Sequence, residues 1–230
     1  MALPPPLVPT RATVRGWWRD CLSGPAVAGS AADRRRVVLT QALVLATGMR
    51  IEECLAAEIA NVEGHWLLLP ETKTHVPRIL YLSGQALAIV AALHPPAQQQ
   101  TLFDAGDDQA AGLLAGWCQS LSSWHALVRA CSTAGPGPYP KRHQCLRKVL
   151  STWLYKLDPV AESAQLGHGG GVVYTHYLAV LRSLPRLLER YRMPDLGVDG
   201  FAWPEPVESK VRRPDRLYAE FRRLVSRRRS

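Results

Sequence analysis

The sequence predicts a mainly α-helical protein with one small antiparallel β-hairpin or sheet. Most apolar residues fall in segments with the length and period of helices, and one stretch between about 65 and 82 changes to two short runs of strand-like residues. Hydrophobic residues make up 47% of the chain, which is enough for a core. The 230 residues therefore fit one domain, or one domain with tails.

Helical patterns account for most of the chain. Residues 1–9 are rich in proline and are expected to be irregular, and Thr10 is a suitable N-cap for the first helix. A run of buried-type residues then ends at Gly48. The expected helices cover about 10–22, 34–47, 51–57, 84–93, 108–117, 121–131, 142–156, 159–166, 171–180, 182–191 and 214–226.

The hairpin is predicted from residues 65–69 and 78–82. Each run is short and rich in apolar and aromatic residues, as strands are. The segment between them, Pro-Glu-Thr-Lys-Thr-His-Val-Pro, is rich in turn-forming residues. This arrangement places Lys73 near the tip of the hairpin.

The charge of the chain is unevenly distributed. The formal net charge is +9, and residues 209–230 hold nine Lys and Arg residues against two acidic ones. The rest of the chain is nearly neutral, so an anion-binding site there requires local clusters of arginine. The basic tail is either a disordered solubilising end or an amphipathic helix that contacts DNA or a neighbouring subunit.

Several classes of protein are disfavoured by what the sequence lacks. The five cysteines are odd in number, and no two of them have the spacing of a zinc site, so a disulfide scaffold is disfavoured and a reducing compartment is favoured. The N-terminus has no apolar signal core, and no apolar run approaches the roughly 18 residues that span a bilayer. Phosphate-loop, dinucleotide-binding and nucleophile-elbow motifs are absent. We therefore expect a cytoplasmic protein with no membrane partner, no metal and no small-molecule cofactor.

Four blocks in the chain resemble the signatures of the tyrosine recombinase (phage integrase) family, in the order and with the separations of that family. The blocks are Ala46-Thr-Gly-Met-Arg50-Ile-Glu-Glu53, the hairpin segment with Lys73, Cys145-Leu-Arg147-Lys148, and Leu166-Gly-His168 followed by Tyr177. The resemblance covers residues 46–177. It implies an integrase-like (DNA breaking-rejoining) catalytic fold and the cleavage and rejoining of DNA strands through a 3′-phosphotyrosyl intermediate.

The resemblance also implies a role for each catalytic residue. Tyr177 is the expected nucleophile, and Tyr174, three residues earlier, is expected to pack. Arg50 and Arg147 are expected to clamp the phosphate, because guanidinium groups bind phosphate oxygens bidentately. Lys73 is the expected general acid for the leaving 5′-oxygen, and His168 is expected to hydrogen-bond the phosphate.

Supporting residues are less clearly defined by the pattern. Glu53 is expected to be structural and to hold an arginine in place. The position where the family has the second-box histidine is occupied by Gln144, with His143 one residue earlier; either fills that role. The expected DNA-binding residues are basic: Lys141, Arg142, Lys148, Arg222 and Arg223.

Each residue also has a structural interpretation, and the chain has other candidate functions. Arg50 can cap a helix, and Lys73 and Arg147 can face solvent. If the substitution at Gln144 removes activity, the chain is a catalytically silent DNA-binding or assembly protein on the same fold. A type IB-like topoisomerase would share the chemistry but act without partner sites.

The expected organisation is an irregular segment at 1–9, a catalytic domain at 10–192, and a linker with a basic helix or tail at 193–230. Double-stranded DNA is the expected partner, bound by a homo-oligomer in the nucleoid. Family members usually carry a further N-terminal DNA-clamping domain, so the chain is expected to be either a truncated piece or a stand-alone catalytic domain. Without that clamp, DNA binding should be weak and sensitive to salt.

Overall fold

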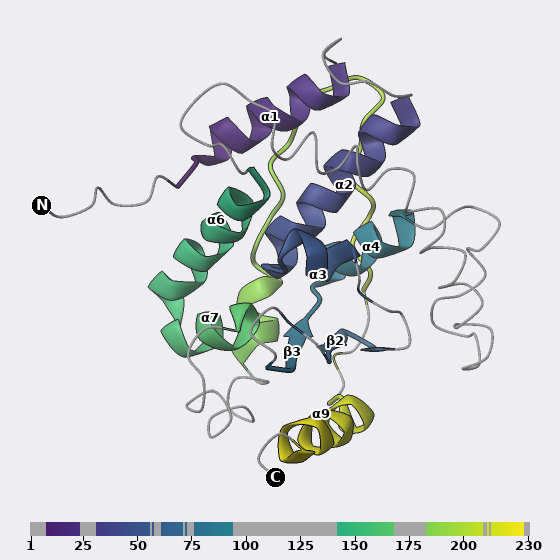
Figure 1. Cartoon of the computed structure of the whole chain (residues 1–230). Helices are drawn as coiled ribbons and strands as arrows, with labels where there is room; N and C mark the ends of the chain where they lie inside the picture. Colours follow the sequence, from purple (N-terminus) through teal and green to yellow (C-terminus); the bar gives the residue numbers. More distant parts are fainter. Residues whose placement is uncertain are drawn as a thin grey trace, which may run out of the picture.

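The structure, a computed structural model, describes residues 8–23, 31–55, 57, 61–70, 72, 76–93, 142–167, 183–208, 211 and 213–227, without the side chains of residues 33, 55, 142 and 143. This part of the chain is mainly helical and holds a small three-stranded antiparallel sheet (Figure 1). The elements are α1 (Arg11–Ser23), α2 (Ala31–Thr47), α3 (Ile51–Leu55), β1 (Val62–Glu63), β2 (Trp66–Leu69), β3 (Arg78–Tyr81), α4 (Gly84–Leu93), α6 (Arg142–Leu157), α7 (Pro159–Leu166) and α9 (Asp215–Arg227). A further helical segment covers 183–188.

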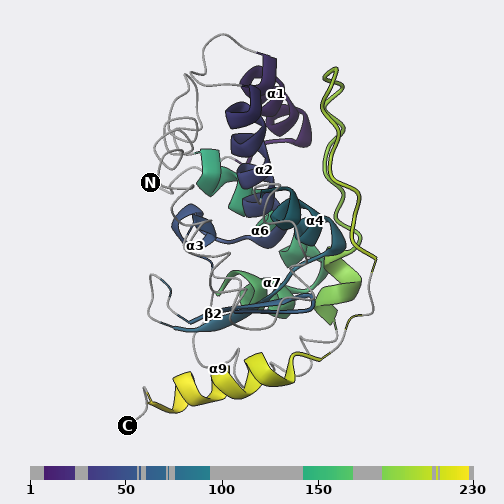
Figure 2. The same cartoon turned by 90° about the vertical axis from the view of Figure 1, so that its right-hand side faces the viewer.

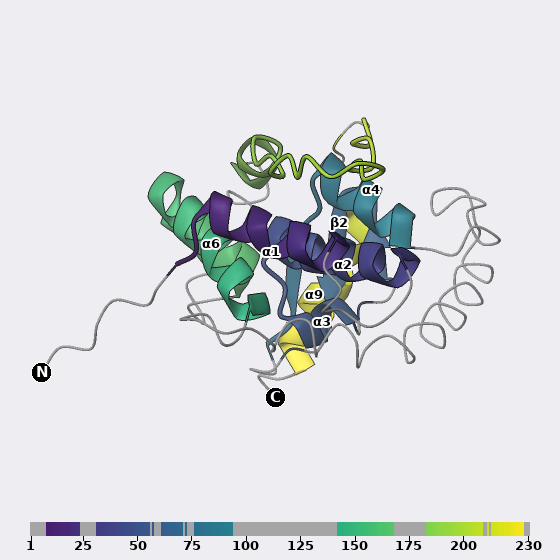
Figure 3. The same cartoon turned by 90° about the horizontal axis from the view of Figure 1, so that it is seen from above.

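Helix α2 lies at the centre of the helical layer. All of its residues from Val37 onward are buried, because α1, α4 and α6 pack against it (Figures 1 and 3). A buried polar contact joins it to α1, where Trp18 Nε1 donates to Gln41 Oε1 at 3.0 Å. The C-terminal end of α2 therefore lies inside the protein, where it meets α6 and the sheet.

The sheet has the order β1–β2–β3, with Trp66 opposite Tyr81 and Leu69 opposite Arg78. All residues of β2 and β3 are buried, because both faces of the sheet are covered. Alternate residues belong to two apolar clusters. Leu67, Leu69, Leu80 and Leu82 pack with α2 and α4, whereas Trp66, Leu68, Ile79 and Tyr81 pack with α6, α7 and α9.

Helix α7 covers the outer edge of the sheet. The amide of Gln165 accepts from the backbone N–H of Tyr81 and donates to its carbonyl, both at 3.0 Å. The same Nε2 donates to the carbonyl of Thr47 at the end of α2, at 2.9 Å. One fully buried side chain thus joins α2, β3 and α7.

Residues 191–208 run in an extended path along α1, α2 and α4 (Figure 2). Trp203 packs edge-on against Trp18, with ring centroids 5.4 Å apart. Further along, the N–H of Val207 donates to the carbonyl of Gly84 at 3.0 Å, and a Cβ at Gly84 would lie 2.5 Å from the Val207 oxygen. This segment leads the chain to the face of the sheet opposite α2.

Helix α9 packs on the face of the sheet opposite α2 (Figure 2). Leu217 and Phe221 are buried, and Tyr218 and Leu224 are partly buried beside them, as the amphipathic pattern predicts. The carboxylate of Glu63 accepts from the backbone N–H of Leu217 at 2.9 Å, in the first turn of the helix. Within the described residues, the basic C-terminal region is therefore a docked helix.

Most expected elements are confirmed, and some boundaries differ. The expected helix over 182–191 is wrong in length, because the helical segment ends at 188. The next residue, Glu189, is held by tertiary contacts: its Oε1 accepts from the Tyr81 hydroxyl at 2.8 Å and from the Gly84 N–H at 3.0 Å.

Strand β1 is present but was not expected, and the helix expected over 51–57 ends at Leu55. The helices expected over 108–117, 121–131 and 171–180 lie outside the described residues. In the described part of the chain, no helix is both long and apolar enough to cross a membrane.

Candidate functional site

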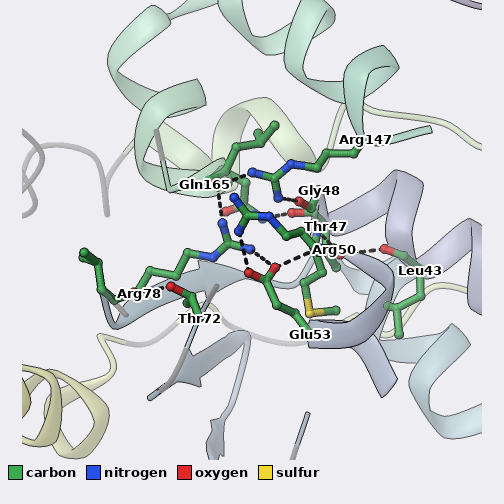
Figure 4. A network of polar contacts seen from close by, with 12 residues as sticks. Leu43, Thr47, Gly48, Arg50, Glu53, Thr72, Arg78, Arg147 and Gln165 are labelled. Atoms are coloured by element: carbon green, nitrogen blue, oxygen red, sulfur yellow. Dashed lines mark hydrogen bonds and ion pairs between the residues drawn. The ribbon is translucent and has the colours of Figure 1, made fainter. Parts of the chain in front are cut away.

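Arginines from three separate segments of the chain meet at the C-terminal end of α2. Arg50 lies between α2 and α3, Arg78 is the first residue of β3, and Arg147 comes from α6 (Figure 4). Glu53 of α3 and the carbonyl of Leu166, at the end of α7, lie among them. We call this group of five residues the arginine cluster.

The turn that presents Arg50 depends on Thr47 and Gly48. The Thr47 hydroxyl donates to the Leu43 carbonyl at 2.6 Å and accepts from the Met49 N–H at 3.2 Å, which ends the helix. Gly48 has a φ of +69°, which side-chain-bearing residues rarely adopt, and a Cβ there would lie 3.1 Å from Leu166 Cγ. The sequence Thr-Gly therefore reverses the chain tightly against α7.

Glu53 holds two of the three arginines. Its Oε2 accepts from the backbone N–H of Arg50 at 2.7 Å and from Arg78 Nη2 at 2.5 Å, while Oε1 accepts from Arg50 Nη1 at 2.7 Å. Burial of the carboxyl group favours its neutral form, but the charge of Arg78 and the bonds and charge of Arg50 outweigh burial and lower the pKa of Glu53. Glu53 is therefore ionised at neutral pH and orients both guanidinium groups.

Arg147 is bound to backbone carbonyls on either side of the cluster. One terminal nitrogen donates to the Gly48 carbonyl and the other to the Leu166 carbonyl, which Arg78 Nη1 also binds. Burial, and then the charges of Arg78 and Arg50, lower the pKa of Arg147 to about 10. Arg147 remains charged at neutral pH. It shares the Leu166 carbonyl with a second positive group, that of Arg78.

The cluster has an excess of positive charge. Glu53 is the only carboxylate of the five-residue cluster, and it pairs with two of the three guanidinium groups, those of Arg50 and Arg78. Arg147 also feels the negative charge of Glu162, which lies outside the cluster. Positive groups outnumber negative ones even when Glu162 is counted. A bound anion would offset this excess, and arginine forks are suited to the oxygens of a phosphate or a carboxylate. The geometry is therefore that of a candidate anion-binding site.

The structure brings together three of the residues expected in the site, Arg50, Glu53 and Arg147. The side chains of Gln144 and Lys148 are exposed on α6. Lys73, Lys141, His168 and Tyr177 lie outside the described residues, as do the side chains of Arg142 and His143.

The two arginines expected to bind DNA in the C-terminal region, Arg222 and Arg223, are exposed on α9. Arg223 Nη2 donates to Glu220 Oε1 at 2.5 Å, one turn earlier on the same helix. Both residues therefore lie on the solvent-facing side of the helix, away from buried Leu217 and Phe221.

Two residues of this region, Arg78 and Gln165, were not predicted to have a role. A signal for Arg78 was present, because it is a charged residue in an otherwise apolar strand, and a buried arginine needs an acidic partner. Nothing local identified Glu53 as that partner. Gln165 directly precedes the Leu-Gly-His block, but its contacts are with residues more than 80 positions away.

Comparisons with protein-family models, with curated proteins and with solved structures find no match to this chain. Among the described residues, no group of three or more His, Cys, Asp and Glu side chains is placed to hold a metal ion.

Replacement of Glu53 by Gln is expected to lower the free energy of unfolding by about 3 kcal/mol at pH 7, because it breaks a buried ion pair. The pKa of Glu53 is lower in the folded than in the unfolded state, so the ionised carboxylate stabilises the fold above the unfolded pKa. That contribution is lost as the pH falls through the folded pKa. Urea unfolding of wild type and Glu53→Gln from pH 7 down to pH 3 should show the two stabilities converging in acid. Exposed Glu208→Gln is the control, and a difference that stays constant with pH would contradict the expectation.

Proposed function

We propose that this protein cleaves and rejoins DNA strands as an integrase-like catalytic domain, through a covalent link between a tyrosine and a 3′-phosphate. The observation that carries the proposal is the meeting of Arg50 and Arg147. These residues stand almost 100 positions apart in the chain, yet Arg147 donates to the Gly48 carbonyl, two residues before Arg50. The mainly helical fold with a small antiparallel sheet is consistent with the proposal.

The charge of the cluster suits phosphoryl transfer. When an oxygen attacks a phosphodiester, negative charge gathers on the non-bridging oxygens in the transition state. Arginine groups that are already in place stabilise that charge without reorganisation. Glu53 supplies this preorganisation for Arg50, and the carbonyls of Gly48 and Leu166 supply it for Arg147.

The remaining catalytic residues are assigned by sequence spacing. Gly167 lies next to Arg78 of the cluster and directly precedes His168 in the sequence. Arg78 begins β3 and follows Lys73 by five positions. In the proposed reaction the Tyr177 oxygen attacks phosphorus, the bond from phosphorus to the 5′-oxygen breaks, and Lys73 protonates that oxygen. Attack by a 5′-hydroxyl reverses the steps. Because the phosphotyrosyl bond keeps the energy of the phosphodiester, the proposed reaction consumes no nucleotide.

The proposal includes double-stranded DNA as the partner, with several copies of the chain assembled on it. Exposed Lys148, next to Arg147, and exposed Arg222 and Arg223 on α9 are available for phosphate contacts. Contacts of this kind release counterions, so DNA affinity should fall steeply as salt increases.

A catalytically silent DNA-binding or assembly protein is the second candidate. It is favoured by the contacts of Arg147, whose two terminal nitrogens are both engaged with backbone carbonyls, and by the glutamine at position 144. In that case the arginine cluster would hold the elements together and bind DNA without cutting it.

The test is capture of a covalent adduct from a pool of nicked duplexes with randomised sequence. Wild type is expected to form adducts that survive denaturation, whereas Tyr177→Phe should form none because it lacks the attacking oxygen. Tyr174→Phe is the matched control and should keep the adduct. Absence of adducts under conditions where wild type binds the pool would support the silent protein. Relaxation of supercoiled plasmid without sequence preference would support a type IB-like topoisomerase.

A further inference from the structure

We propose that Arg78 is the positioning residue of the arginine cluster, which sets where Arg50 and Arg147 stand without itself touching the phosphate. This inference rests on the proposed function for its catalytic consequence. Its structural basis is a set of contacts that join three separate segments of the chain: the α2–α3 turn, strand β3 and the end of α7.

Burial distinguishes Arg78 from the partly exposed Arg50 and Arg147, and it keeps Arg78 from contact with a phosphate. Its side chain is 5% exposed, and its two terminal nitrogens are already bound, Nη2 to Glu53 Oε2 at 2.5 Å and Nη1 to the Leu166 carbonyl. Gly167 follows at a φ of +71°, and a Cβ there would lie 2.7 Å from Arg78 Nη1. The guanidinium is therefore packed directly beneath the chain that leads toward His168.

Arg78 shares a binding partner with each of the two clamp arginines. Glu53 Oε2 binds Arg78 together with the backbone of Arg50, which leaves Oε1 for the Arg50 guanidinium (Figure 4). On the other side, Arg78 and Arg147 donate to the same Leu166 carbonyl. Movement of Arg78 would therefore shift the supports of Arg50 and Arg147 at once.

The geometry requires arginine rather than any positive charge. The planar guanidinium sends two nitrogens to two different acceptors, whereas a lysine ammonium sits at one point on a flexible stem. Arg78→Lys therefore keeps the charge of the cluster but is expected to lose the contact with either Glu53 or the Leu166 carbonyl. The substitution thus separates positioning from electrostatics.

The experiment compares wild type, Arg78→Lys and a control, Arg35→Lys, on the nicked duplex that wild type cuts best. Arg35 lies on α2, where it packs against Phe201 and donates to the Ala202 carbonyl at 3.4 Å. We expect Arg78→Lys to slow adduct formation about 100-fold, as small displacements of reacting groups do, while the dissociation constant for DNA changes less than about threefold. Arg35→Lys should cut at a rate within about twofold of wild type.

A second measurement is independent of cleavage. In ¹⁵N spectra of arginine side chains, wild type should show restricted rotation of the Arg50 and Arg147 guanidinium groups, and Arg78→Lys should release it. The double variant Glu53→Gln/Arg78→Met removes both buried charges together. It serves as the second variant if Arg78→Lys fails to fold. It should also show released rotation and slow cutting.

The outcomes separate this inference from the proposed function. Cutting by Arg78→Lys at the wild-type rate would overturn the positioning role, as would unchanged rotation of Arg50 and Arg147. If wild type binds DNA without cutting it, the proposed function fails, and the spectra alone then decide whether Arg78 positions the two arginines.

Discussion

Arg50→Ala is expected to slow formation of the covalent DNA adduct by roughly two to three orders of magnitude, which is the usual cost of removing one electrostatic donor from a transition state. The Arg50 side chain is 29% exposed, so unlike the guanidinium of Arg78 it can still reach a ligand. Its guanidinium contacts Glu53 and lies beside Arg147 (Figure 4). We expect the loss to appear in the rate of cutting, because DNA affinity is shared among many phosphate contacts.

Arg50 also allows a cleaner test than Arg147. Replacement of Arg147 would remove one hydrogen-bond donor from the Gly48 carbonyl and one from the Leu166 carbonyl. When Arg50 is replaced, Glu53 still has its ion pair with Arg78. Single-turnover cutting of a nicked duplex measures the effect, with thermal unfolding of each variant as the check on folding. Arg19→Ala, an exposed arginine on α1, is the control. Cutting by Arg50→Ala at the wild-type rate would remove the anion clamp from the mechanism.

Gln165→Leu is expected to lower the free energy of unfolding by about 3–5 kcal/mol. The substitution removes three hydrogen bonds from a fully buried side chain, and it leaves the backbone N–H of Tyr81 and the carbonyls of Thr47 and Tyr81 without them. A buried polar group without a partner costs about 1–3 kcal/mol, whereas the leucine gains little because the site already excludes water. Urea unfolding measures the loss.

Gln85→Leu is the matched comparison for this effect. Gln85 Nε2 donates one hydrogen bond, to the Pro204 carbonyl at 2.9 Å, from a partly buried position. Its loss should cost about 1 kcal/mol, in the range of a single hydrogen bond. Equal losses in the two variants would mean that Gln165 does not act as the joint between α2, β3 and α7.

Helix boundaries that depend on local signals were predictable from the sequence. Helix α7 occupies the predicted range because Asp158 accepts from the N–H groups of Val160 and Ala161 at one end and Gly167 adopts a left-handed conformation at the other. Helix α4 also occupies its predicted range. Capping residues, proline and glycine act within a few positions of one another, so a single sequence contains the whole signal.

The candidate site was predictable only in part. Motif spacing identified Arg50, Glu53 and Arg147, and the structure brings these three together. It did not indicate that Arg78 stands between them, because a side chain 25 residues from Glu53 and 88 from Leu166 is brought to both by the packing of β3 against α7.

The sequence by itself therefore determined the helical class, the β2–β3 hairpin and, within the described residues, the approximate ends of most helices, because these depend on short-range periodicity and capping. Only the tertiary structure decided that α9 docks on its own sheet, that residues 191–208 lead there along α1 and α4, and that one carboxylate holds two arginines. Those outcomes depend on contacts between distant segments, and the free energy of such contacts is set by how the elements pack.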